Sequence, residues 1–127
     1  MSNKAVISTP DAPDAIGPYS QAVKVGNTIY LSGQIPLVPE TMEMVEGGIG
    51  EQARRVFDNL KAVAEAAGGN FGQVVKVNIS LTDLDDFGIV NEIMASYFEA
   101  PYPARACVQV AALPRGARIE VEATMAL

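Results

Sequence analysis

The sequence predicts an α+β fold in which two helices cover one face of a single sheet, and three observations support this. A long segment near the middle of the chain repeats apolar residues at the spacing of one helical face. A shorter segment that ends before Pro101 and Pro103 shows the same helical spacing, and short β-rich stretches flank both helical segments. Because both helices connect strands, we expect them on one side of the sheet. At 127 residues the chain fits one domain, residues 1–127.

The N-terminal third predicts short strands. Residues 1–13 indicate an edge strand followed by a loop, and the Gly-Pro pair in residues 16–19 predicts a turn. Gly26-Asn27 suits a tight hairpin turn because both residues tolerate positive φ. We therefore expect a hairpin formed by strands 21–25 and 28–32.

Residues 49–67 give the clearest element, an amphipathic helix. The apolar positions that share one face are Ile49, Ala53, Val56, Phe57, Leu60, Val63, Ala64 and Ala67. Charged side chains occupy the opposite face, where Glu51 can pair with Arg55 one turn later. Gly68-Gly69 ends the helix.

The second half predicts a strand, a helix and two more strands. Residues 74–81 alternate apolar positions (Val75, Val77, Ile79 and Leu81) with polar ones. Asp83, Asp85 and Asp86 are candidate N-caps for a helix that ends near Phe98, because Pro101 and Pro103 forbid its continuation. Its expected buried stripe is Phe87, Val90, Ile93, Met94, Tyr97 and Phe98. The last strands are expected at 105–111 and 117–125, adjacent enough in sequence to suggest a hairpin.

The second face of the sheet has no cover within this chain. The predicted elements supply only two layers, so an apolar sheet face would remain open to water. We therefore expect burial against other subunits, with closed cyclic symmetry.

Composition excludes several function classes. The net charge is −6 without a basic run, which disfavours nucleic-acid binding. The sequence begins without the apolar core of a signal peptide and contains no run of about 20 apolar residues, so we expect cytoplasmic residence. With one cysteine and no histidine, the chain cannot build Ser-His-Asp or Cys-His catalysis, histidine-based ribonuclease chemistry or a histidine-ligated zinc site. Carboxylates, Tyr, Arg and backbone groups remain.

The last two predicted strands each carry a polar face. In the first, Arg105, Cys107 and Gln109 share one face, and we expect the other set, Ala106, Val108 and Val110, to belong to the core. In the second, the polar set is Arg118, Glu120, Glu122 and Thr124. These faces fit solvated sides of a sheet, but a partly covered Arg105 requires an anion. That anion is either a ligand carboxylate or Glu120 or Glu122 of the same chain.

Three further residue sets carry weaker signals. Tyr19 follows Gly-Pro on a loop, where it either binds a ligand or covers the core edge. Ser32-Gly33 ends a strand, and Gly33 either admits close approach of a ligand or forms an ordinary turn. Without a histidine nearby, Cys107 fits packing or backbone donation better than nucleophilic attack.

Several segments resemble, in order and spacing, signatures of the reactive intermediate deaminase family, RidA, also called the YjgF or L-PSP family. They are residues 16–22 (IGPYSQA), 31–36 (LSGQIP), the helical segment from Gln52 through Asn59-Leu60, and residues 103–108 (PARACV) and 119–123 (IEVEA). The resemblance covers nearly the whole chain. It implies a homotrimer of chorismate-mutase-like α+β subunits, each with a mixed six-stranded sheet and two helices on one face. It also implies sites in the clefts between subunits and a last strand inserted elsewhere in the sheet instead of forming a hairpin.

The resemblance also implies roles for individual residues. Arg105 clamps the substrate carboxylate, the backbone of Cys107 helps to hold the ligand, and Glu120 holds and activates the attacking water. Tyr19, Ser32, Gly33 and Asn91 line the same cleft, Tyr19 as part of the catalytic set. The implied reaction hydrolyses 2-iminobutanoate and 2-iminopropanoate, released by pyridoxal-phosphate dehydratases, to 2-oxo acids and ammonia. Because an iminium carbon is already electrophilic, this chemistry requires neither cofactor nor metal.

Two other functions stay open at the level of sequence. One is a non-catalytic or regulatory module that binds small carboxylates or partners at the same clefts. The other is an endoribonuclease that inhibits translation, an activity attributed to some family members. The acidic charge and the absence of histidine argue against the second.

Overall fold

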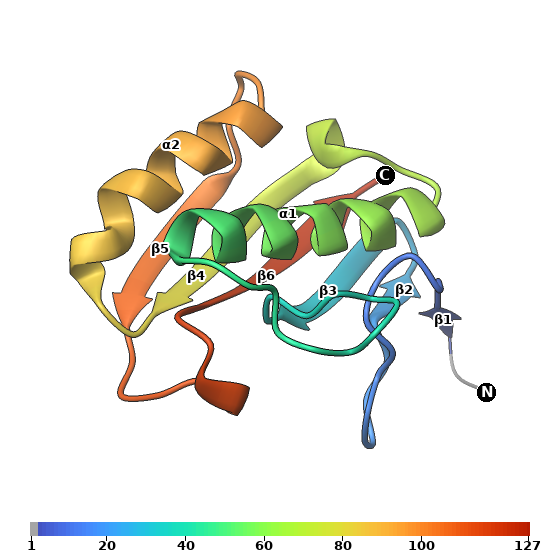
Figure 1. Cartoon of the computed structure of the whole chain (residues 1–127). Helices are drawn as coiled ribbons and strands as arrows, with labels where there is room; N and C mark the ends of the chain where they lie inside the picture. The colour runs from blue at the N-terminus through green and yellow to red at the C-terminus, as the bar shows by residue number, and fades with distance from the viewer. Residues whose placement is uncertain (1–2) are drawn as a thin grey trace.

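The chain folds into a six-stranded sheet with two helices on one of its faces (Figure 1). This computed structural model describes residues 3–127. The elements in chain order are β1 (Lys4–Ile7), β2 (Ala22–Val25), β3 (Thr28–Gln34), α1 (Ile49–Ala66), β4 (Val74–Leu81), α2 (Phe87–Tyr97), β5 (Ala104–Gln109) and β6 (Ile119–Ala126). No helix in this part of the chain is long and apolar enough to cross a membrane.

The strand order is β1-β2-β3-β6-β4-β5, so the last strand lies in the middle of the sheet. The expected hairpin of the last two strands does not form, and the insertion implied by the family resemblance is confirmed. β4 and β5 are parallel and the other neighbours are antiparallel, which makes the sheet mixed. A parallel pair requires a crossover, and α2 supplies it.

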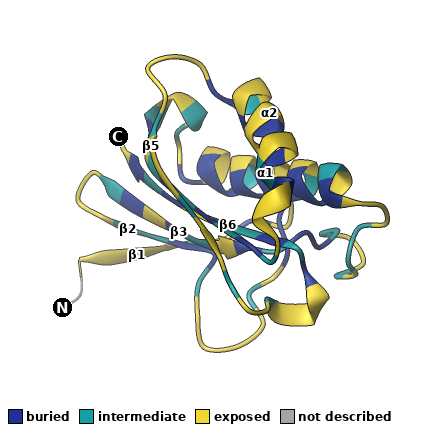
Figure 2. Ribbon diagram, turned by 90° about the vertical axis from the view of Figure 1, so that its left-hand side faces the viewer, coloured by how far each residue is buried: buried dark blue, intermediate teal, exposed yellow. Residues whose placement is uncertain are grey.

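The core lies between the sheet and the two helices (Figure 2). Helix α1 crosses the central strands and buries the face that its periodicity predicts, with Val56, Phe57 and Val63 fully enclosed. From the sheet, alternate residues of β4 and β6 meet it, including Ile79 and Val121. The predicted stripe of α2 is also confirmed: Val90, Ile93, Met94 and Phe98 are buried, and Phe87 and Tyr97 pack against the core.

The expectation that Ala106, Val108 and Val110 form core is wrong. Val108 pairs with Ser80 and Cys107 with the buried Ile79, so Cys107 faces the helices and Val108 faces the open side of the sheet. Val108 is 52% exposed, and β5 is exposed along most of its length (Figure 2). Alternation shows which residues share a face, but it does not show which face is covered.

Two local expectations also fail. Val75 is exposed because the pairing of β4 with β6 shifts between Val74 and Lys76, which turns one apolar position outward. The carboxylate of Glu51 accepts a hydrogen bond from the backbone N–H of Gly48 at the start of α1 (2.9 Å), where backbone donors lack helical partners. Arg55 instead donates to Asn59 on the same helix (3.1 Å).

Candidate functional site

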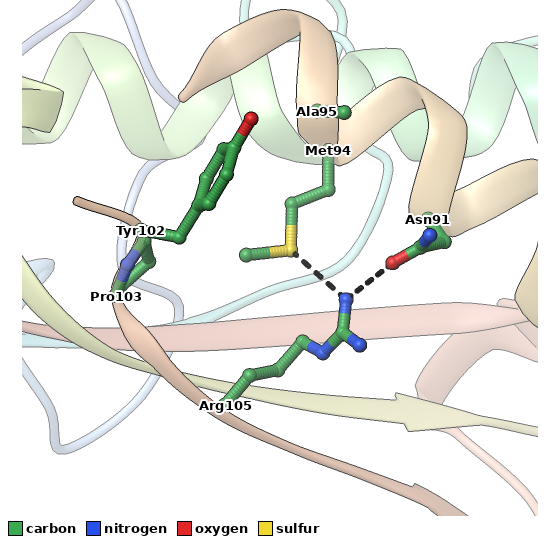
Figure 3. A pocket seen from close by; sticks show the side chains of 6 residues that line it. All are labelled: Asn91, Met94, Ala95, Tyr102, Pro103 and Arg105. Carbon is green, nitrogen blue, oxygen red and sulfur yellow. Dashed lines mark hydrogen bonds between the residues drawn. The ribbon is translucent and has the colours of Figure 1, made fainter. Parts of the chain in front are cut away.

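Arg105 leaves β5 on the side covered by α2, and three side chains of that helix hold its guanidinium. Nη1 donates to Oδ1 of Asn91 and lies 3.8 Å from Sδ of Met94, and the guanidinium carbon lies 5.0 Å from the centre of the Phe87 ring. These three residues recur at the spacing of one helical face. Figure 3 shows the guanidinium pointing from the strand toward α2. The helix therefore fixes where the charge lies.

A surface pocket of about 480 Å³ opens beside this arginine. Its lining residues are Asn91, Met94, Ala95, Tyr102, Pro103 and Arg105 (Figure 3). Within residues 3–127 the guanidinium of Arg105 forms no salt bridge with a carboxylate; its hydrogen-bond partners are Asn91 and Met94. The alternative of an ion pair between Arg105 and Glu120 or Glu122 is thus absent from the single chain. A positive charge with neutral partners at a pocket suits an incoming anion.

Cys107 lies two residues further along β5, half-buried against the core. Burial raises the pKa of its thiol above the ordinary value, although the nearby Arg105 charge acts in the opposite direction. A raised pKa keeps the thiol neutral near pH 7, and a neutral thiol is a weak nucleophile. The side chain is therefore suited to packing and not to attack on a substrate.

Glu120 lies on the open face of the sheet, against a bulge in β3. Between the pairs Leu31–Ala123 and Gln34–Val121, β3 has two residues, Ser32 and Gly33, where β6 has one. A methyl group at Gly33 would lie 3.0 Å from the carboxyl carbon of Glu120, so a larger residue there would require this carboxyl group to move. The group that approaches Gly33 closely is thus a side chain of the same chain.

The pKa of the Glu120 carboxyl is raised, chiefly by burial and secondly by the like charge of Glu122. A carboxyl group whose pKa is shifted toward neutrality exchanges protons more readily near pH 7.

Among residues 3–127, no group of three or more His, Cys, Asp or Glu side chains is placed to hold a metal ion.

Ser32 of β3 lies next to the loop that carries Tyr19. Ser32 Oγ donates to the carbonyl oxygen of Ser20, and the backbone N–H of Ser32 donates to the carbonyl oxygen of Gln21 (2.9 Å). These two hydrogen bonds connect the Tyr19 loop to β3. Tyr19 is exposed, and its hydroxyl accepts a hydrogen bond from Ile16 N–H (3.3 Å). A hollow of about 230 Å³ includes both Tyr19 and Gly33 in its lining.

The predicted site residues therefore form two groups within one chain. Arg105, Asn91 and Cys107 lie on the helix side of the sheet, whereas Glu120 lies on its open side with Gly33 against its carboxyl group. Tyr19 and Ser32 belong with Gly33, because Tyr19 shares a hollow with Gly33 and Ser32 precedes it in β3. The strand register requires this separation: Arg105 pairs with the buried Val77, while Glu120 pairs with Ser80, which faces the other way. One chain does not bring the arginine and the glutamate together.

Sequence reasoning missed the partners of Arg105 on α2. It assigned Phe87 and Met94 to the core and did not connect them with the arginine. One signal in the sequence could have indicated these partners: Phe87, Asn91 and Met94 recur at the spacing of one helical face. It also missed the ion pair between Arg118 and Asp86, which joins segments 32 residues apart in the chain.

The chain matches known proteins over nearly its whole length. The family model described as Endoribonuclease L-PSP matches residues 9–127. A 2-iminobutanoate/2-iminopropanoate deaminase of Dermatophagoides farinae is 52% identical over 127 residues, which cover 100% of this chain and 99% of that protein. A deaminase of the same name from Mus musculus is 54% identical over 120 residues, covering 94% and 89%.

Solved structures agree with these matches. RidA from an Antarctic Psychrobacter superposes with a TM-score of 0.94 at 55% identity, covering 97% of this chain and 99% of that one. Escherichia coli TdcF with bound serine gives a TM-score of 0.93 at 42% identity, covering 97% and 98%. The sequence motifs, the insertion of β6 in the sheet and these matches all place the chain in one group: it belongs to the endoribonuclease L-PSP family, which includes the Rid proteins.

Proposed function

We propose that this protein is an imine deaminase that hydrolyses 2-iminobutanoate and 2-iminopropanoate to 2-oxo acids and ammonia. Curated relatives from mite and mouse carry this name, and each is more than half identical to the chain. The observation that carries the proposal is the guanidinium of Arg105, which neutral partners hold beside an open pocket. Such a group binds a planar carboxylate through two parallel hydrogen bonds.

The chemistry needs a positioned water and one proton-transferring group. Glu120 accepts a proton from water as the water oxygen bonds to the imine carbon, and return of this proton to the nitrogen gives a carbinolamine. Glu120 then transfers the hydroxyl proton of the carbinolamine to the nitrogen, the C–N bond breaks, ammonia leaves and the C=O bond of the 2-oxo acid forms. The raised pKa of Glu120 supports this role because the group must both take and return a proton. Tyr19, Ser32 and Gly33 complete the surroundings of the reacting centre.

We further propose that each site is shared by two subunits of a homotrimer. Arg105 and Glu120 point to opposite faces of one sheet, so a cleft that contains both requires a second copy of the chain. The exposed Val108 and Tyr30 support burial of the open face against neighbouring subunits. β5 is an edge strand, which leaves backbone groups near Cys107 available to a ligand.

The direct test measures release of 2-oxobutanoate from 2-iminobutanoate generated by a threonine dehydratase. The wild-type protein should accelerate release over the spontaneous rate, and Arg105→Ala should lose most of the acceleration. Equal rates for both proteins would contradict the assignment of Arg105. Binding of 2-oxobutanoate by the wild type without any acceleration would instead identify a small-carboxylate-binding module. TdcF has been solved with bound serine, so binding of a small carboxylic acid has a precedent in that protein.

A ribonuclease activity is the second candidate, because the matching family model is described as Endoribonuclease L-PSP. The net charge of −6 opposes approach of a phosphate backbone. Cleavage of a defined RNA by highly purified protein, abolished by Glu120→Ala, would support it. We expect no cleavage.

A further inference from the structure

The ion pair between Arg118 and Asp86 joins the residue directly before β6, the strand that carries Glu120, to the residue directly before α2, the helix that holds Arg105. Nη2 of Arg118 donates to both carboxylate oxygens of Asp86, at 2.9 and 2.8 Å. Asp86 is only 8% exposed, whereas the side chain of Arg118 is 41% exposed. A carboxylate this well enclosed requires a partner, because an unpaired charge there would be costly.

Asp86 lies directly before α2, yet its carboxylate makes no capping hydrogen bond to that helix. An Asp at such a position commonly accepts from the first backbone N–H groups of the helix. Here the carboxylate binds Arg118 instead. The start of α2 is thus attached to the segment before β6, in addition to its own chain connection.

The segment before β6 is itself fixed to the rest of the molecule. The backbone N–H of Arg118 donates to Oε1 of the buried Gln52 on α1 (2.9 Å). The backbone carbonyl oxygen of Arg118 accepts a hydrogen bond from Thr82 N–H (3.1 Å). Arg118 therefore has little freedom to follow α2 if that helix moves. The ion pair holds α2 in place against a rigid support.

The same end of α2 determines the position of the Arg105 guanidinium. Phe87, the residue after Asp86, lies against the guanidinium, and Asn91 accepts its hydrogen bond one turn later. Arg105 itself comes from an edge strand with a neighbour on one side only, so the strand alone constrains it weakly. A shift of the first turn of α2 would move both contacts together.

We propose that Arg118, through Asp86, is a positioning residue that sets where Arg105 holds the substrate carboxylate. This proposal rests on the proposed function, in which Arg105 binds the carboxylate. Arg118 does not line the pocket beside Arg105.

The test compares Asp86→Asn and Arg118→Gln with the wild type. Both variants should raise KM for 2-iminobutanoate about 3- to 30-fold, because residues in one hydrogen-bonded network are energetically coupled. The value of kcat should change by less than about twofold, because a misplaced clamp weakens ground-state and transition-state binding alike. Arg118→Lys should give an intermediate KM, because an ammonium keeps the charge but changes the geometry. Arg55→Gln is the matched control, because it removes an arginine whose side chain bonds within α1, and its KM should stay at the wild-type value.

Three results would overturn the proposal. They are an unchanged KM in folded Asp86→Asn and Arg118→Gln, a fall in kcat at unchanged KM, and a KM in Arg118→Lys equal to that in Arg118→Gln. If one variant fails to fold by circular dichroism, the other and Arg118→Lys decide the outcome.

Calorimetric titration with 2-oxobutanoate separates this proposal from the proposed function, because binding requires no turnover. A wild type that binds without turnover would contradict the deaminase, while weaker binding by Asp86→Asn would still support the role of Arg118. A wild type that turns over, with equal binding by the variants, would contradict only the role of Arg118.

Discussion

The two charged residues at the centre of the proposed site owe their character to different neighbours. Arg105 has partners that are neutral, namely an amide, a thioether and an aromatic ring, so its charge is not balanced within the chain. Glu120 is partly buried beside another carboxylate, which disfavours its ionised form. Arg105 is therefore suited to bind an anion, and Glu120 is suited to exchange a proton.

The raised pKa of Glu120 predicts the pH dependence of the reaction. In the proposed mechanism the ionised form of Glu120 activates water, so kcat/KM should fall as pH drops through a pKa above the ordinary 4.5. Glu122→Gln removes the like charge and should shift this acidic limb to lower pH. The measurement is a pH profile of 2-oxobutanoate release for both proteins. An acidic limb at the same pH in both would show that Glu122 does not act on Glu120.

Because the folded pKa of Glu120 is raised, the fold favours its protonated form. Its contribution to the free energy of unfolding is therefore fully present below pH 4.5 and is lost as pH rises through the folded pKa. Near neutral pH, the burial of the ionised Glu120 carboxylate beside Glu122 therefore lowers the free energy of unfolding.

The close contact between Gly33 and Glu120 predicts that a single methyl group disturbs catalysis. In Gly33→Ala the added carbon would lie 3.0 Å from the Glu120 carboxyl carbon, so the carboxyl group must move. We expect kcat to fall about 10- to 100-fold, within the usual contribution of a positioned acid or base. Gly88→Ala is the matched control, because a methyl group there meets nothing within 4 Å. Equal kcat in wild type and Gly33→Ala would contradict the importance of this contact.

At the scale of elements, the two helices have different tasks. α1 covers the central strands and supplies most of the enclosed helix residues, whereas α2 lies beside the edge strand β5 and presents one face to Arg105. Stability should therefore depend mainly on α1, and ligand binding on α2.

This division predicts the outcome of a core truncation in α1. Leu60 is 2% exposed, so Leu60→Ala should lower the free energy of unfolding by about 2–5 kcal/mol through lost burial and a cavity. The value of kcat per folded molecule should remain that of the wild type. Urea denaturation measures the first quantity, and Lys61→Ala, one residue away on the exposed side, is the control. A large loss of kcat in folded Leu60→Ala would contradict the separation of tasks.

At the scale of the whole molecule, the sheet separates the two residues that the proposed reaction needs to bring together. Arg105 extends from one face and Glu120 from the other, and strand register fixes both directions. A shared site therefore requires a neighbouring subunit, as proposed for the homotrimer.

Subunit mixing tests this arrangement. Arg105→Ala and Glu120→Ala should each be inactive alone, but co-refolding equal amounts should restore activity at about a quarter of the sites, where one wild-type Arg105 meets one wild-type Glu120. The measurement is 2-oxobutanoate release after mixing, with each variant refolded alone as the control. Activity that stays at the level of the single variants would contradict a site shared between chains.

The sequence alone determined the elements and much of the site's composition. Periodicity located α1 to within one residue and the strand 74–81 at its observed ends, because burial on one face imposes a repeat that local sequence displays. The absence of histidine left arginine and carboxylates as the chemical inventory. The family motifs indicated the candidate residues and the insertion of the last strand.

Only the tertiary structure decided which faces are covered and which residues meet. Alternation in β5 grouped Arg105 with Cys107, but the register with β4 determined that this group faces the helices and that Val108 faces outward. The contacts of Phe87 with Arg105 and of Asp86 with Arg118 join residues 18 and 32 positions apart. Local patterns carry no information about such pairs, because strand order and helix packing bring them together only in the folded chain.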